Sequence, residues 1–257
     1  MSATAPIPAW PALDDVARIV RAAGEVVMAV YAQPFDVRRK DDASPVTEAD
    51  ERAEALIVPA LRALAPGIPV VAEEMAARGE ADAIGATFWL VDPLDGTKEF
   101  ISRNGEFTVN IALVHQGRPV LGVVGAPAVG RLFAGAAGQG AWTEDAQGRR
   151  PIHVRTVPAE GLTVVASRSH GDAEALDRFL HGRRVARLVN AGSSLKLCLL
   201  AAGEADLYPR LGRTMEWDIA AGHAVLAAAG GRVERLDGGG FGYGKPGFEN
   251  PHFVACA

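Results

Sequence analysis

Apolar residues in the first part of the chain follow two spacings. From Leu13 to Tyr31 and from Thr47 to Leu64 they return every three or four residues, which is typical of amphipathic helices. Short strands are expected from Phe35 to Lys40 and from Ile68 to Ala72. The run from Phe88 to Val91 is continuously apolar, which indicates a buried strand. This part of the chain is therefore predicted to alternate helices and strands.

The middle of the chain alternates apolar and polar positions with the period of strands. A hairpin turn at Gln116-Gly117 separates the first two of these strands, and the succession of strands and turns predicts an antiparallel meander. The expected strands are Phe107–His115, Val120–Ala126, Arg131–Gly135 and Gly140–Thr143. The segment Asp145–Arg150 is polar and rich in turn residues, and we expect a domain boundary just after it, between residues 155 and 156.

The second half alternates strands with helices, which predicts a mixed or parallel sheet. Strands are expected at Leu162–Ser167, Val185–Asn190, Ala205–Tyr208 and Phe253–Cys256, and helices at Asp172–Leu180, Ser194–Ala202 and Ile219–Ala229. We therefore expect an α+β domain over residues 1–155 and an α/β domain over residues 156–257.

Composition narrows the class of protein. The chain has 257 residues, of which 49% are hydrophobic and 22% charged, as in soluble globular proteins. Its net charge of -5 argues against binding to nucleic-acid polymers. No apolar run approaches the ~20 residues of a membrane span, and Met1–Pro11 lacks the features of a signal peptide. The two cysteines, Cys198 and Cys256, do not suggest a disulfide framework, so we expect a cytoplasmic protein.

The segment after the apolar run at Phe88 carries candidate chemistry. Pro93 has no N–H, so the strand is expected to end there, and Asp92 and Asp95 then lie on one turn. Two carboxylates and a backbone carbonyl make the all-oxygen environment that Mg²⁺ prefers. The amides of Gly96 and Thr97, near a helix start, would suit a phosphate. The alternative is a surface turn with a capping aspartate.

The string Asp92-Pro-Leu-Asp-Gly-Thr97 resembles the signature of the inositol monophosphatase-like, metal-dependent phosphatases. Its continuation to Ala112 is similar to the CysQ-type 3′(2′),5′-bisphosphate nucleotidase branch of that family. The likeness extends from about Lys40 to the C-terminus. It implies the family's fold, a layered αβαβα sandwich.

The resemblance implies a metal site made of oxygen ligands. One cation would be held by Glu73, Asp92 and the Leu94 carbonyl, and a second by Asp92, Asp95 and Asp218. Trp217-Asp-Ile-Ala-Ala-Gly222 matches the family motif around the last ligand, although an aspartate at a helix start can also be an N-cap. The expected cofactor is Mg²⁺, as two or three ions, with Mn²⁺ as a substitute and Li⁺ as an inhibitor.

The resemblance also implies how water is activated. Thr97 would accept a hydrogen bond from the attacking water and donate its own to Asp50, with Glu73 as a further catalytic residue. Thr47 and Asp50 have the spacing of a helix capping box, and we expect capping for Thr47 and function for Asp50.

The substrate pocket is expected mainly in the second half. The resemblance puts Ser193, Lys196 and Arg210 around a nucleotide, with His170 near its sugar or base. Gly96, Thr97 and Asp218 complete the expected set. The alternative interpretation is that Lys196 and Arg210 are solvated surface residues and that His170 is an ordinary loop residue.

The implied reaction is hydrolysis of the 3′-phosphate of adenosine 3′,5′-bisphosphate to AMP, and of its sulfo-derivative, 3′-phosphoadenylyl sulfate, in sulfur assimilation. The alternatives are an inositol monophosphatase or related small-metabolite phosphatase, and a regulatory binding protein that has lost catalysis. We expect a monomer or homodimer without a transmembrane segment. Peripheral association with the inner face of the cell membrane is a further expectation from relatives.

Overall fold

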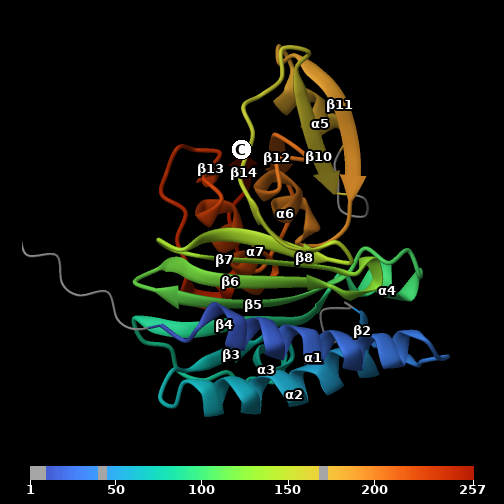
Figure 1. The fold of residues 1–257 in the computed structure, drawn as a ribbon, viewed down its shortest axis with the longest axis vertical. Helices are drawn as coiled ribbons and strands as arrows, with labels where there is room; N and C mark the ends of the chain where they lie inside the picture. Colours follow the sequence, from blue (N-terminus) through green and yellow to red (C-terminus); the bar gives the residue numbers. More distant parts are fainter. Residues whose placement is uncertain (1–9, 40–44, 168–172) are drawn as a thin grey trace, which may run out of the picture.

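The computed structural model describes residues 10–39, 45–167 and 173–257. Helices and sheets alternate in layers (Figure 1): two helices, a seven-stranded sheet, two more helices, a five-stranded sheet and an outer helix. This is the αβαβα arrangement that the resemblance implied. None of the described helices is both long and apolar enough to cross a membrane.

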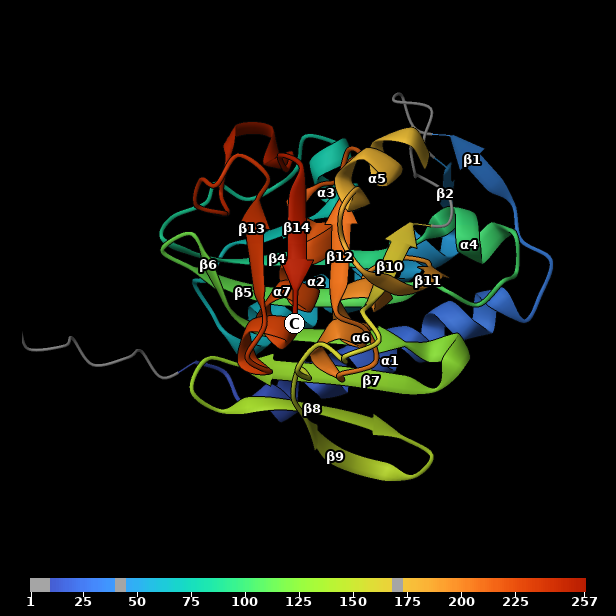
Figure 2. The ribbon, with the colours of Figure 1, turned by 90° about the horizontal axis from the view of Figure 1, so that it is seen from above.

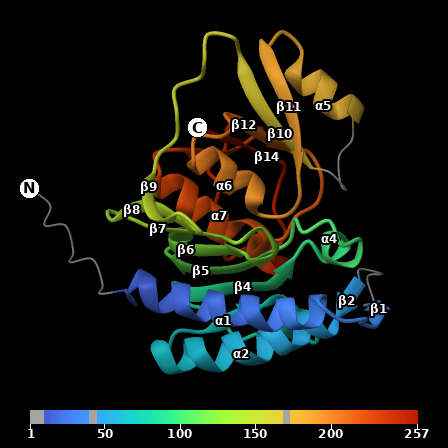
Figure 3. The same cartoon turned by 45° about the vertical axis from the view of Figure 1, so that its right-hand side comes forward.

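The first helical layer is formed by α1 (Leu13–Tyr31) and α2 (Glu48–Leu64), with the bounds closely as predicted. Their apolar sides are buried, as at Val20 in α1 and Ile57 in α2. The two helices cover one face of the seven-stranded sheet (Figure 3). Beside them, β1 (Val37–Arg39) and β2 (Pro45–Thr47) pair antiparallel.

The seven-stranded sheet follows the chain order, and only its first two strands are parallel. The predicted meander is confirmed, and an exposed edge strand, β9 (Gly148–Ile152), extends it in part of the segment expected to be turns. Its Arg149 and Arg150 are exposed, so the strand lacks an apolar alternation that sequence could reveal. The strands are β3 (Val70–Ala72), β4 (Thr87–Asp95), β5 (Thr108–His115), β6 (Arg118–Ala126), β7 (Arg131–Ala136), β8 (Gly140–Asp145) and β9 (Gly148–Ile152). A 3₁₀ turn, η1 (Pro127–Val129), joins β6 to β7.

The central helices are α6 (Leu195–Ala201) and α7 (Glu216–Ala228), so α7 begins earlier than predicted. Close packing of α7 on the sheet depends on glycine. A Cβ at Gly122 of β6 would lie 2.3 Å from the Ala221 carbonyl oxygen, and one at Gly135 of β7 would lie 2.9 Å from the Val225 Cα. The helix therefore lies directly on the sheet, with its N-terminal turn near the end of β4.

The five-stranded sheet has the order β11-β10-β12-β14-β13 and mixes parallel and antiparallel pairs, as predicted. Its strands run across those of the larger sheet (Figure 2). They are β10 (Leu162–Ser167), β11 (Val185–Ala191), β12 (Leu207–Arg210), β13 (Arg232–Arg235) and β14 (Phe253–Cys256), with α5 (Ala173–Leu180) outside and the 3₁₀ turn η2 (Pro246–Phe248) before β14. β13 was not predicted from the sequence, because Val233 is its only buried residue and no apolar alternation marks it.

The predicted domain boundary at residues 155 and 156 lies in the connection from β9 to β10. One hydrophobic cluster spans the junction, with Phe133 from the larger sheet, Val225 from α7, and Val165 and Phe253 from the smaller sheet. The division of the chain into two domains at that boundary therefore stays a prediction.

Candidate active site

The end of β4 differs from the prediction, because the strand continues through Pro93. Asp92 pairs with Asn110 of β5 and Asp95 pairs with Thr108, with an irregularity between the two pairs. The irregularity accommodates the missing N–H of the proline. The Leu94 amide donates to Asp92 Oδ1 at 3.0 Å, which fixes that carboxylate. The strand thus presents both aspartates within one short distorted segment.

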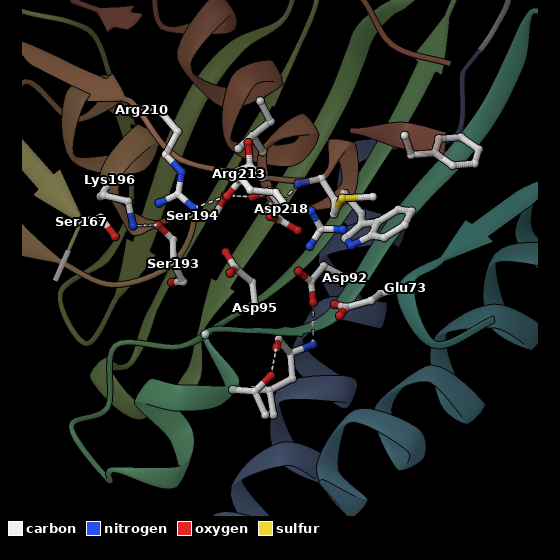
Figure 4. A pocket seen from close by; sticks show the side chains of 18 of the residues that line it. Glu73, Asp92, Asp95, Ser167, Ser193, Ser194, Lys196, Arg210, Arg213 and Asp218 are labelled. Atoms are coloured by element: carbon white, nitrogen blue, oxygen red, sulfur yellow. Dashed lines mark hydrogen bonds between the residues drawn. The ribbon is translucent and has the colours of Figure 1, made fainter. Parts of the chain in front are cut away.

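A cavity of about 870 Å³ opens at this segment. Four carboxylates point toward one another in Figure 4: Asp92 and Asp95 from the larger sheet, and Glu73 and Asp218 from two helices. The carboxylate of Glu99 also lines the cavity. Nearly all the residues that the sequence singled out line it: Glu73, Asp92, Leu94, Asp95, Gly96, Thr97, Ser193, Lys196, Arg210 and Asp218. His170 lies outside the described residues, and Asp50 lies just behind the cavity wall.

Asp218 is brought to the cavity by the first turn of α7. The N-cap of this helix is Met215, so Asp218 is not the N-cap residue of the alternative interpretation. Its Oδ2 accepts the Met215 amide at 2.9 Å, which satisfies one free N–H at the helix start. The carboxylate therefore has a fixed direction.

Glu73 is the first residue of a short helix, α3 (Glu73–Ala77), directly after β3. Glu54 of α2 accepts the amides of Glu74 and Met75 at 3.0 and 3.1 Å, and Arg78 binds its other oxygen at 2.9 Å. This buried carboxylate caps α3 and sets its direction. Glu73 then lines the cavity, whereas Glu74 is buried.

Asp50 and Thr97 are connected across two helices. Thr47 is the N-cap of α2, as expected, and both its amide and its hydroxyl donate to Asp50 Oδ2, at 2.8 and 2.7 Å. The other oxygen, Oδ1, lies 3.4 Å from Oγ1 of Thr97, at the start of α4 (Thr97–Ile101). The Thr97 hydroxyl is also 3.3 Å from the Leu94 carbonyl. Asp50 therefore takes part in the cap of α2 and also contacts Thr97.

The opposite side of the cavity carries cations. Nζ of the buried Lys196 donates to the carbonyls of Ser193 at 2.6 Å and Ala191 at 3.2 Å, so it shapes the loop before α6. Ser193 has a left-handed backbone, with φ of 44°. Arg210, at the end of β12, is buried and donates to the Arg213 carbonyl at 2.6 Å.

The family model described as "Inositol monophosphatase family" matches residues 13–252 of the chain. The chain belongs to the inositol monophosphatase family. It is 50% identical over 244 residues to the 3′(2′),5′-bisphosphate nucleotidase CysQ of Escherichia coli O157:H7, covering 94% of this chain and 98% of that protein. The solved structure of CysQ from Bacteroides thetaiotaomicron superposes with a TM-score of 0.79 at 36% identity, covering 95% and 96% of the two chains. An inositol monophosphatase from Anabaena gives 0.75 at 27% identity, covering 95% and 89%.

Enzymes of the inositol monophosphatase family are metal-dependent phosphatases, and the electrostatics of this cavity fit that chemistry. Burial raises the pKa of Asp95 to about 6, with smaller contributions from Glu73 and Glu99. Burial, followed by the charges of Asp95 and Glu73, raises the pKa of Asp218 well above its usual value. Carboxylates that disfavour one another's charge are stabilised by a cation between them.

The donor set consists of oxygen, which suits hard divalent cations better than zinc. Within the described ranges, no three His, Cys, Asp or Glu side chains already lie close enough together to share one metal ion. The carboxylates thus form an open cluster facing a cavity, and Glu73, Asp92, Asp95 and Asp218 are the residues that would hold cations there.

Several lining residues in this family member were not predicted from sequence. Arg213, Met215, Trp217 and Phe248 line the cavity. The rings of Trp217 and Phe248 lie 5.8 Å apart. Phe248 is the last residue of η2, which follows a glycine-rich segment with no helical or strand periodicity. Its position depends on long-range contacts, such as the two hydrogen bonds from the amides of Gly244 and Lys245 to the buried Glu216.

Proposed function

We propose that the chain is a metal-dependent phosphomonoesterase that hydrolyses the 3′-phosphate of adenosine 3′,5′-bisphosphate to AMP and phosphate. Its likeness to CysQ nucleotidases over nearly the whole chain supports this function. The observation that carries the proposal is that one cavity has two different sides. The carboxylate side consists of Glu73, Asp92, Asp95 and Asp218, and the cationic side of Lys196 and Arg210. A substrate with two phosphates can use both sides.

The carboxylate side would hold the phosphate that is cleaved. We propose Mg²⁺ as the cofactor, two or three ions per site, with Mn²⁺ as a substitute and Li⁺ as an inhibitor. When bound, these cations supply Lewis-acid activation of water and neutralise charge on the phosphate. Glu73, Asp92, Asp95, Asp218 and the Leu94 carbonyl would hold them.

Thr97 and Asp50 would orient the attacking water. Because the Thr97 hydroxyl donates toward Asp50 Oδ1, its lone pairs remain to accept a hydrogen bond from water. Asp50 keeps its orientation through Thr47, which donates to the other oxygen. The backbone amides of Gly96 and Thr97 would bind phosphate oxygens. Ser193 and Asp218 would also contact the substrate, and no covalent phosphoenzyme is required.

The cationic side would bind the second phosphate. Arg210 presents a permanently charged, planar guanidinium suited to phosphate, and its Nε has no hydrogen-bond partner in the described part of the chain. Lys196 adds charge beside it. Burial lowers the Lys196 pKa to about 8, so an anion nearby would favour its charged form.

The test compares phosphate release, with Mg²⁺, from adenosine 3′,5′-bisphosphate and myo-inositol 1-phosphate, with the nucleotide product identified by chromatography. We expect higher kcat/KM on the bisphosphate and 5′-AMP as product. Preference for the inositol ester would keep the metal chemistry and overturn the proposed substrate. If phosphate were released from neither compound while the fold stayed intact, the proposed phosphatase activity would be wrong and a binding protein would be favoured.

A further inference from the structure

Two buried polar residues connect Asp95 of β4 with Asp218 of α7. They are Asn110 of β5, which is 1% exposed, and Ser194 just before α6, which is 3% exposed. Neither was among the site residues expected from sequence. We call them the Asn110–Ser194 pair.

Asn110 lies beside Asp95 and Asp218. It is directly opposite a third aspartate, Asp92, in the antiparallel ladder, so the side chains of Asn110 and Asp92 project on the same face of the sheet. Its amide nitrogen lies 3.4 Å from Asp95 Oδ2 and 3.5 Å from the backbone carbonyl oxygen of Asp218. An amide nitrogen has two hydrogens, one for each acceptor.

Ser194 makes the matching contacts from the other side. Its hydroxyl donates to the Asp218 carbonyl at 2.9 Å. Its backbone N–H contributes to lowering the pKa of Asp95, against the larger effect of burial. Both members of the pair therefore contact Asp95 through its carboxylate and Asp218 through its carbonyl.

The cost of these residues suggests that they do more than fill the core. Asn110 Oδ1 is buried without a hydrogen-bond partner in the described ranges. A buried acceptor left unpaired is destabilising, whereas an apolar residue of similar size at this position would not carry that cost.

We propose that the Asn110–Ser194 pair positions Asp95 and Asp218 relative to each other, so that the two carboxylates can share a divalent cation. Asp95 comes from a strand of the larger sheet and Asp218 from a helix lying on it. Small shifts of that helix would separate them unless something connects the two. These are positioning residues, and their role rests on the proposed function.

The test measures Mn²⁺ binding to metal-free protein by titration calorimetry, for wild type, Asn110→Leu and Ser194→Ala. Because partners that orient metal ligands typically change metal affinity about 10–100-fold, we expect a loss in that range for Asn110→Leu and a smaller loss for Ser194→Ala. The concentration of Mg²⁺ that gives half-maximal activity should rise in parallel. Ser194→Ala keeps the test open if Asn110→Leu does not fold.

The matched control is Thr143→Val, which removes a buried hydrogen bond to the Leu132 carbonyl in the same sheet, away from the cavity. It should lower thermal stability and leave Mn²⁺ affinity unchanged. Unchanged affinity in both folded pair variants, with tight binding in wild type, would overturn this inference alone. Absence of divalent-cation binding in wild type would overturn the proposed function as well.

Discussion

The two sides of the cavity are built in different ways. The carboxylate side is held mainly by regular structure: Asp92 and Asp95 lie in a paired strand, and Asp218 lies in the first turn of a helix. On the cationic side Lys196 lies in α6 and Arg210 at the end of β12, but a loop also takes part. In the loop before α6, Ser193 adopts a left-handed backbone and its carbonyl accepts a hydrogen bond from Lys196. The side proposed for catalysis is thus fixed mainly by secondary structure, whereas the side proposed for substrate choice combines secondary structure with a loop.

This difference bears on the family. A metal site set by strands and helices can stay constant while loops change, so related enzymes can share one reaction and differ in substrate. The same scaffold is seen in a CysQ and in an inositol monophosphatase. Changes on the carboxylate side should therefore remove activity toward every substrate, and changes on the cationic side should alter preference.

The largest effect is expected for Asp92→Asn. Because changes to residues that merely orient ligands cost about 10–100-fold, loss of a proposed ligand should lower kcat by more than ~100-fold on all phosphate esters. Phosphate release and circular dichroism check this. Activity close to wild type in a folded Asp92→Asn protein would contradict the proposed metal site.

Arg210→Met should separate the two sides. Hydrogen bonds from charged groups contribute about 1.5–3 kcal/mol, so kcat/KM for adenosine 3′,5′-bisphosphate should fall roughly 10–100-fold. For a monophosphate substrate it should change little. The control is Arg232→Met, at an exposed position on β13. An equal loss on both substrates would show that Arg210 does not recognise the second phosphate.

Gly122→Ala tests whether close packing of α7 supports the carboxylate side. The new Cβ would lie 2.3 Å from the Ala221 carbonyl oxygen, so the helix must move. Overpacking of this kind costs about 1–3 kcal/mol, and Asp218 should shift with the helix, which weakens cation binding. Gly85→Ala is the control, since its Cβ meets nothing within 4 Å. Equal melting temperatures and Mn²⁺ affinities in the two variants would argue against this support.

The smallest effect concerns His223, on the same helix. Burial lowers its pKa to about 4 from 6.5, so it is neutral in the folded protein. The unfolded chain binds the extra proton below about pH 6.5, and stability is therefore lost as pH falls from there toward 4. Between pH 7.5 and 5, wild type should lose about 2 kcal/mol more than His223→Gln in urea unfolding. Parallel pH profiles would contradict a buried neutral histidine.

Much of the fold was predictable because its signals are local. Helical spacing gave α1 and α2, alternation gave the meander, and the string after Asp92 gave the helix start at Thr97. The errors have physical reasons. In the edge strand β9 only Ile152 is buried, so no apolar alternation marks the strand, and β4 passes Pro93 because an irregularity removes the need for its N–H.

The candidate site was predictable where residues are adjacent in sequence or belong to a motif. Asn110, Ser194 and Glu54 were missed because their contacts join segments far apart in the chain. No local spacing signals such contacts. Lys196 was expected to meet substrate, and the structure adds that it also binds its own loop.

The most direct test of the proposed function compares kcat/KM of the wild-type protein, with Mg²⁺, on adenosine 3′,5′-bisphosphate and on adenosine 3′-monophosphate. The two compounds share the phosphate that is cleaved and differ only in the 5′-phosphate that the cationic side would bind. We expect at least about tenfold preference for the bisphosphate, which corresponds to one charge-assisted hydrogen bond. Equal rates on the two nucleotides would contradict the proposal that this cavity recognises two phosphates.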